Sequence, residues 1–150
     1  GVCSTRNVEL VRSLGADHVI DYTREDFTRN GQRYDLVLDN AGSRTWAEYK
    51  RVLTPNAMFI IVGAPKTKGP IGPLGQILKI RLGSLRATQH VTFFIAQFNR
   101  GDMGVLRELI EAGKVTPFVE RTYSLRETTQ AMHYQGTGHA RGKIVISIKE

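Results

Sequence analysis

Apolar side chains recur along this 150-residue chain with two kinds of spacing. Between positions 7 and 14 they stand three and four residues apart, the spacing of one helical face, and Gly15 supplies a helix end. Positions 34–39 form a short apolar run, typical of a strand that is covered on both faces of a sheet. In chain order, such patterns predict a helix at 7–14, strands at 18–21 and 34–39, a helix near 45–53 that Pro55-Asn56 ends, and a strand at 57–62.

The second half of the chain continues this alternation of helices and strands. Its patterns predict a helix within 77–85, a strand at 90–95, a helix at 103–112, an extended stretch at 116–119, a helix at 125–134 and a strand at 143–148. Residues 66–75 are rich in Gly, Pro and Lys, a composition typical of a loop that closes over a ligand. We find no internal repeat and no linker that divides the chain.

Strands and helices that alternate at this rhythm predict an α/β fold with a doubly wound, Rossmann-like parallel sheet. Val2-Cys3 has the character of the end of a buried strand that enters a helix directly. We therefore expect the chain to start inside a larger fold and its sheet to be incomplete at the N-terminus. Ligands in this architecture bind at the carboxyl ends of strands. Those ends are polar or glycine-rich here, at 3–6, 21–22, 39–42 and 62–65.

Composition is that of an ordinary globular protein, with 41% hydrophobic residues. No apolar run approaches the roughly 20 residues of a membrane span, and the N-terminus lacks the features of a signal peptide. We therefore expect a cytoplasmic protein. The single Cys3 excludes an internal disulfide and a multi-cysteine zinc cluster, and the four histidines are too scattered to indicate a metal site.

The formal net charge of +7 is unevenly distributed. No acidic residue stands between Glu48 and Asp102, whereas this stretch carries Lys50, Arg51, Lys66, Lys68, Lys79, Arg81, Arg86 and Arg100. Such a stretch can attract a polyanion, but it equally fits a solvated face or the lining of a site for a phosphate-bearing ligand. No nucleic-acid-binding motif accompanies it, so we do not expect nucleic acid as a partner.

Ser4 and Arg6 at the first strand end are the candidates most open to a physical argument. In a dinucleotide-binding fold, a carboxylate at the end of the second strand binds the ribose hydroxyls of NAD, whereas hydroxyl and cationic side chains accept the extra phosphate of NADP. The first strand end here has no carboxylate, which favours NADP. Tyr22 at the next strand end could stack beside the adenine or contact the same phosphate. The alternative is that Ser4 caps the following helix and Arg6 is a surface residue.

A second candidate group follows the later strands. Residues 40–42, and then Gly63 and Ala64, are small or polar, and small residues let a dinucleotide approach the backbone closely. A simple turn explains them equally well. Lys143 follows a glycine-rich loop at 136–142 and could contact a phosphate, although a solvated loop also explains it.

The sequence pattern indicates no catalytic residue. Cys3 has no identifiable base beside it, so we interpret it as a small buried hydrophobe. His139 is a lone loop histidine, a type that usually has no catalytic role. Asp39 is interpreted as a hydrogen-bonding residue at a strand end rather than as a general base.

Four segments follow one another along almost the whole chain: 3–7 (CSTRN), 14–22 (LGADHVIDY), 34–42 (YDLVLDNAG) and 138–145 (GHARGKIV). Together they resemble the medium-chain dehydrogenase/reductase superfamily, and within it the zinc-independent quinone oxidoreductase branch. The resemblance implies a cofactor domain that binds NADPH and a separate barrel-like domain that closes over it. It also implies hydride transfer from NADPH to a quinone, an enone or a similar carbonyl compound.

The resemblance also implies roles for individual residues. Ser4 and Arg6 would meet the adenosine 2′-phosphate, Tyr22 the adenosine side, Asn40, Val62, Gly63 and Ala64 the nicotinamide side, and Lys143 the pyrophosphate or the nicotinamide ribose. The strand at 90–95 would match the edge through which members of the family dimerise.

The chain departs from the family pattern in what it lacks. The family's first cofactor-domain strand, its Gly-x-Gly-x-x-Gly turn and its substrate domain do not occur in the 150 residues. We therefore interpret 1–150 as the C-terminal portion of a dinucleotide-binding domain that is inactive on its own. The alternative is a non-catalytic dimerising or anion-binding module derived from such a domain. A strand without its neighbour tends to recruit another chain, so we expect a homo-oligomer.

Overall fold

A computed structural model of the chain describes residues 1–42, 44–62, 72–93 and 97–148. The chain divides into two compact units, Gly1–Gln97 and Phe98–Glu150. Composition gave no sign of this division.

The first unit opens with a short parallel pair of strands. Strand β1 (Val2–Cys3) leads through the 3-10 helix η1 (Thr5–Asn7) into α1 (Val8–Ser13), and β2 (Ile20–Asp21) pairs parallel with β1. This order confirms the predicted strand end, helix and strand. The second strand is shorter than expected, because only its last two residues join the ladder.

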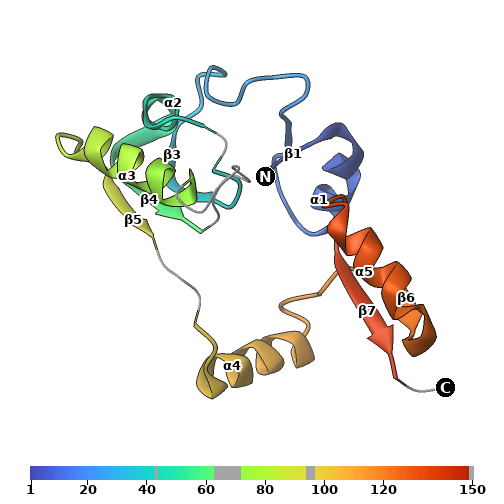
Figure 1. The fold of residues 1–150 in the computed structure, drawn as a ribbon. Helices are drawn as coiled ribbons and strands as arrows, with labels where there is room; N and C mark the ends of the chain where they lie inside the picture. The colour runs from blue at the N-terminus through green and yellow to red at the C-terminus, as the bar shows by residue number, and fades with distance from the viewer. Residues whose placement is uncertain (43, 63–71, 94–96, 149–150) are drawn as a thin grey trace. The chain divides into compact units, whose positions relative to one another are not determined.

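A three-stranded parallel sheet forms the rest of the first unit (Figure 1). Its elements are β3 (Tyr34–Asp39), α2 (Trp46–Val52), β4 (Leu53–Ile61), α3 (Gly72–Ser84) and β5 (His90–Phe93), with strand order β3-β4-β5. Helix α2 begins with a capping box in which the Thr45 side chain accepts from the N–H of Glu48 and the Glu48 side chain accepts from the N–H of Thr45. The parallel strands and intervening helices confirm the predicted α/β class.

The core of the first unit lies on one face of this sheet. Phe59 on β4 is completely buried, and its ring packs 4.5 Å from the Tyr49 ring and 5.9 Å from the Trp46 ring, measured between centroids. Ile80 from α3 joins the same cluster. Helices α2 and α3 therefore cover the face of the sheet toward which the Phe59 side chain points.

The opposite face of the sheet is open. Leu36 and Leu38 on β3 are 57% and 55% exposed, and Met58, the register partner of Leu36 on β4, is 46% exposed. The expectation that β3 is covered on both faces was wrong for the described chain. Only alternate residues such as Val37 point toward the aromatic core, because successive side chains of a strand point to opposite faces.

Pro55 and Asn56 were also misplaced by the sequence pattern. They were expected to end helix α2, but the helix ends at Val52 and both residues lie within β4. The β3–β4 register shifts between Tyr34 and Leu36, and Asn56 adopts a φ of 64°. Proline cannot donate to the ladder and asparagine tolerates a positive φ, so the pair forms an irregularity in the strand rather than a helix end.

The second unit is a smaller parallel α/β arrangement. It contains α4 (Arg100–Glu111), β6 (Val119–Ser124), η2 (Leu125–Glu127), α5 (Thr128–Gly136) and β7 (Lys143–Ser147). Strands β6 and β7 pair parallel, and the Ser124–Glu127 capping box starts the turn that leads into α5. These elements confirm the two predicted helices and the last strand, whereas the extended stretch begins later than expected.

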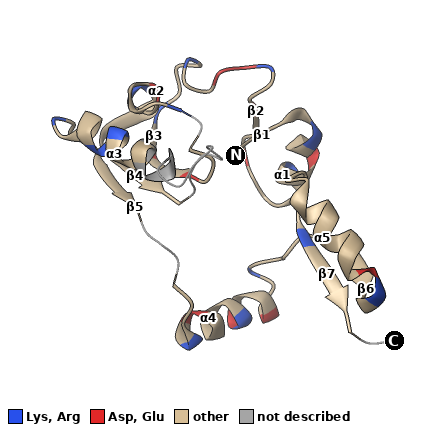
Figure 2. Ribbon diagram, viewed as in Figure 1, with Lys and Arg blue, Asp and Glu red and all other residues tan. Residues whose placement is uncertain are grey.

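In the described chain, Lys and Arg residues occur on several elements of both units (Figure 2). Arg81 on α3 donates to the carbonyl of Val91 over 3.1 Å, so this member of the basic stretch ties α3 to β5. Lys66 and Lys68 lie outside the described residues. Of the helices in the described ranges, none combines the length and the apolar character that crossing a bilayer requires.

Candidate functional site

The ends of β1 and β2 meet at one edge of the first unit. Cys3 pairs with Asp21, and the backbone N–H of Tyr22 donates to the carbonyl of Cys3 over 3.0 Å. Ser4 and Tyr22, which directly follow β1 and β2, therefore lie side by side. Arg6 follows two residues after Ser4, on η1, so the three residues predicted for the adenosine end of a cofactor lie at or just after this edge.

Ser4 is at the N-cap position of η1, yet its side chain makes no capping hydrogen bond. Its backbone carbonyl, not its hydroxyl, is engaged in the turn and accepts from the N–H of Asn7 over 2.8 Å. The capping alternative is therefore not supported. Ser4 is half-buried, whereas Arg6 and Tyr22 are exposed.

Thr5, Asp21 and Thr23 form a cluster beside Ser4 that sequence reasoning did not assign. The Thr5 hydroxyl donates to Asp21 Oδ2 over 2.6 Å and lies 2.7 Å from Thr23 Oγ1. The Thr23 N–H donates to Asp21 Oδ1 over 2.9 Å. The hydrogen bond from Thr5 is the largest influence that lowers the pKa of Asp21, so the carboxylate is ionised at neutral pH. The signal available in the sequence was the Asp-x-Thr turn after a strand.

A second strand end carries Asn40. Asp39, 6% exposed, accepts from the N–H groups of Ala41 and Gly42 over 3.1 and 2.9 Å. The interpretation of Asp39 as a strand-end hydrogen-bonding residue agrees with this geometry. Gly42 has a φ of 61°, which favours glycine. This turn directs Asn40 away from β3 into an exposed position.

Val62 lies beside this turn. Its N–H donates to the carbonyl of Asp39 over 2.9 Å, so Asn40 and Val62 follow neighbouring strand ends. Gly63 and Ala64 lie outside the described residues. Lys143 begins β7 in the second unit, where its N–H donates to the carbonyl of Phe118 over 2.8 Å.

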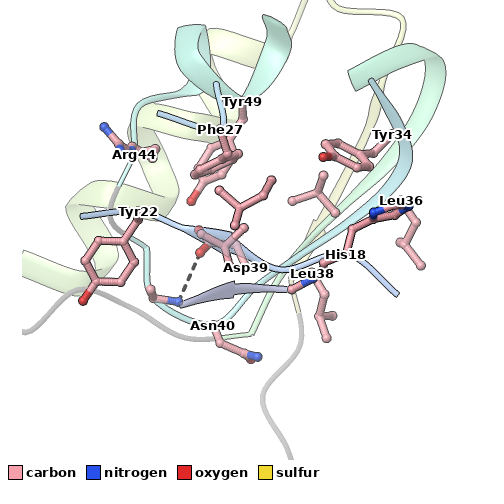
Figure 3. Close-up of a pocket in the computed structure, with 15 residues that line it drawn as sticks. His18, Tyr22, Phe27, Tyr34, Leu36, Leu38, Asp39, Asn40, Arg44 and Tyr49 are labelled. Atoms are coloured by element: carbon pink, nitrogen blue, oxygen red, sulfur yellow. Dashed lines mark hydrogen bonds between the residues drawn. The ribbon is translucent and has the colours of Figure 1, made fainter. Parts of the chain in front are cut away.

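A cavity of about 870 Å³ lies between the β1–β2 pair and β3 (Figure 3). Tyr22 and Asn40 line it, together with Leu36, Leu38 and the aromatic Tyr49. One residue of each strand-end group, Tyr22 and Asn40, thus borders this cavity, whereas Ser4, Arg6 and Val62 do not line it.

Two titratable side chains of the first unit, Tyr49 at this cavity and Cys3 on β1, have raised pKa values. Burial is the largest influence that raises the pKa of Tyr49 far above its usual value, and the charge of Asp39 acts in the same direction, so the phenol stays protonated. Burial also raises the pKa of the Cys3 thiol, which disfavours its nucleophilic form. Within the described ranges, no group of three or more His, Cys, Asp or Glu side chains could hold a metal ion.

A family model described as zinc-binding dehydrogenase matches residues 14–146. The chain belongs to this family, and with it to the medium-chain dehydrogenase/reductase superfamily. The zebrafish (Danio rerio) NAD(P)H oxidoreductase RTN4IP1, mitochondrial, is 32% identical over 162 residues, covering 99% of this chain and 42% of that protein. The trans-enoyl reductase pgmF of Aspergillus terreus is 36% identical over 161 residues, covering 99% of this chain and 44% of that protein.

The fold of this chain has counterparts among solved structures. The quinone oxidoreductase from Coxiella burnetii superposes with a TM-score of 0.75 at 24% identity, covering 99% of this chain and 44% of that one. The chain spans less than half the length of the curated relatives it matches. One of those relatives carries a mitochondrial designation, and a cytoplasmic location stays a prediction here.

Proposed function

We propose that this chain supplies the NADPH-binding part of an oxidoreductase that reduces a quinone, an enone or a related carbonyl compound without a zinc ion. The names of its relatives, an NAD(P)H oxidoreductase, a trans-enoyl reductase and a quinone oxidoreductase, support this class of reaction. The observation that carries the cofactor assignment is the edge formed by Ser4, Arg6 and Tyr22.

The chemistry of this edge fits a 2′-phosphate better than two free ribose hydroxyls. Ser4 offers a hydroxyl that makes no capping bond, and Arg6 is a permanent cation two residues further along. The carboxylate at this edge belongs to Asp21, and both of its oxygens already accept hydrogen bonds. A ribose hydroxyl would therefore compete with protein donors for that carboxylate.

The remaining candidate residues would hold the other end of the same cofactor. Asn40 borders the cavity at the end of β3, Val62 follows the neighbouring strand β4, and both would face the nicotinamide. For Gly63 and Ala64, which lie outside the described residues, the same role stays a prediction from the family resemblance. For Lys143, which belongs to the second unit, contact with the pyrophosphate or ribose stays a prediction from the family resemblance. When bound, the cofactor supplies the hydride, and these residues bind and orient it. We expect the 150 residues alone to bind without catalysing the reaction.

Calorimetric titration of the chain with NADPH and NADH tests this proposal. We expect NADPH to bind at least about tenfold more tightly, because a charge-assisted hydrogen bond to a phosphate contributes roughly 1.5–3 kcal/mol. Arg6→Ala should abolish most of the preference, whereas Arg33→Ala, which changes an exposed arginine in the loop before β3, should keep it. Equal affinity for the two cofactors, or no binding of either, would contradict the proposal.

The alternative is a non-catalytic dimerising or anion-binding module derived from such a domain. The observation in its favour is the open apolar face around Leu36 and Leu38, which a second protein surface could cover. The same titration separates the two functions, since a module that only associates with proteins has no reason to distinguish NADPH from NADH.

A further inference from the structure

Three side chains join the turn after β1 to the turn after β2. Thr5 lies between Ser4 and Arg6 in the first turn, whereas Asp21 and Thr23 belong to the second. The carboxylate of Asp21 receives the Thr5 hydroxyl over 2.6 Å, the Thr23 N–H over 2.9 Å and the Thr23 hydroxyl over 2.7 Å. Thr5 is 16 residues from Asp21 and 18 residues from Thr23 in the sequence, so its contacts hold two separate segments together.

The number of hydroxyl protons limits the hydrogen bonds that Thr5, Thr23 and Asp21 can make with one another. Three short oxygen–oxygen contacts link Thr5, Thr23 and Asp21, but the two hydroxyls carry only one proton each. Two protons cannot fill three contacts, and the arrangement that satisfies both carboxylate oxygens has Thr5 donate to Asp21 Oδ2 and Thr23 donate to Asp21 Oδ1. Both protons are therefore used inside the cluster, and Thr5 has no proton left for a ligand.

We propose that Thr5, Asp21 and Thr23 form a latch that determines cofactor specificity by fixing the turn that carries Ser4 and Arg6. The inference rests on the proposed function, because it assigns these residues to the same NADPH site. Thr5 is a positioning residue here. Its hydroxyl fixes the backbone between the two phosphate-binding side chains, and the ligand contacts come from Ser4 and Arg6.

The latch has a second consequence for specificity. The side chain of Asp21 is only 12% exposed, and its carboxylate is ionised and fully engaged. Arg24 lies 3.5 Å from Asp21 Oδ2 and partly offsets its charge. If Thr5 no longer held Oδ2, this oxygen could accept a ribose hydroxyl, which is the contact that favours NADH. Without the latch, the preference for NADPH over NADH should therefore decrease for two reasons: NADPH binds more weakly and NADH gains a contact.

The test measures dissociation constants of the full 150-residue chain for NADPH and NADH in four variants. Thr5→Val keeps the shape and removes the hydroxyl, and we expect it to weaken NADPH binding about tenfold while NADH binding is weakened less than about twofold or improves. Thr5→Ser keeps a hydroxyl at this position and should keep the wild-type ratio of the dissociation constants for NADH and NADPH. Thr23→Val removes the other hydroxyl and should lower the ratio partially. Thr92→Val makes the same change at an exposed site on β5 and should leave the ratio unchanged.

The outcomes distinguish the latch from the site itself. A wild-type preference for NADPH that survives Thr5→Val and Thr23→Val overturns the latch and leaves the proposed function standing. Equal losses for NADPH and NADH also overturn it, since they indicate a merely structural role. A wild-type chain that does not distinguish the cofactors overturns the proposed function and the latch together.

Discussion

Gly42 shows how much of the site depends on single backbone positions. Its φ of 61° lets the N–H groups of Ala41 and Gly42 point back at the Asp39 carboxylate, which fixes the turn below Asn40. The left-handed conformation costs a residue with a Cβ atom roughly 1–2 kcal/mol.

Gly42→Ala should therefore lower the free energy of unfolding by about 1–2 kcal/mol, measured by urea denaturation and followed by the fluorescence of Trp46. The matched control is Gly75→Ala in helix α3, where φ is not positive and a Cβ atom would meet nothing within 4 Å. That change should raise stability by roughly 0.5–1 kcal/mol. Equal effects of the two substitutions would show that the turn does not need a glycine.

At the scale of elements, Glu120 on β6 holds the loop that precedes β7. Its carboxylate accepts from the N–H groups of Arg141 and Gly142 over 2.6 and 3.3 Å and from the Tyr134 hydroxyl over 2.9 Å. The bond from the Arg141 backbone is the largest influence that lowers the pKa of Glu120 below its usual 4.5.

Because the pKa of Glu120 is lower in the folded chain than in the unfolded one, its contribution to stability is complete above about pH 4.5. It is lost as the pH falls through the folded value. Amide hydrogen-exchange protection of Arg141 and Gly142 should therefore decrease in acid, and Glu120→Gln should reduce both the protection at neutral pH and its acid dependence. The Glu108→Gln control on exposed α4 should behave as wild type. Unchanged protection in Glu120→Gln would contradict this role of the carboxylate.

The sequence pattern predicted elements well where one periodicity dominated. Strand β3 has the predicted bounds. The helix predicted at 7–14 corresponds to the end of η1 and to α1, because apolar residues three and four positions apart indicate one face of a helix. The pattern failed at Pro55-Asn56, because turn-forming residues also occur at irregular positions inside strands.

The candidate site was predictable only in part. The adjacent strand ends that carry Ser4 and Tyr22 follow from the parallel pairing of β1 with β2, and the neighbouring ends at Asn40 and Val62 follow from that of β3 with β4. The Thr5–Asp21 bond does not follow, since it joins segments 16 residues apart and depends on the register of two short strands.

At the scale of the whole molecule, the uncovered face of the β3-β4-β5 sheet predicts self-association. Within the described residues, β3 pairs with β4 alone, and Leu36 and Leu38 beside its free edge are more than half exposed. Unpaired strand edges and exposed apolar surface both favour contact with another chain.

Sedimentation at high micromolar concentration should therefore give a mass above that of the 16.8 kDa monomer. The double variant Leu36→Lys/Leu38→Lys should shift the chain toward monomer. Leu85→Lys, at a side chain that is 77% exposed after α3, should not. A wild-type monomer at this concentration would contradict the prediction.

The most direct test of the central claim, that the turn after β1 binds a 2′-phosphate, uses two small probes. Adenosine 2′,5′-bisphosphate and adenosine 5′-monophosphate differ only in that phosphate, and neither needs the nicotinamide end of the site. Titrations followed by the backbone amide signals of Ser4 and Arg6 should show saturable shifts with the bisphosphate and much weaker ones with the monophosphate. Equal responses to both probes, or bisphosphate-induced shifts that avoid Ser4 and Arg6, would contradict the account.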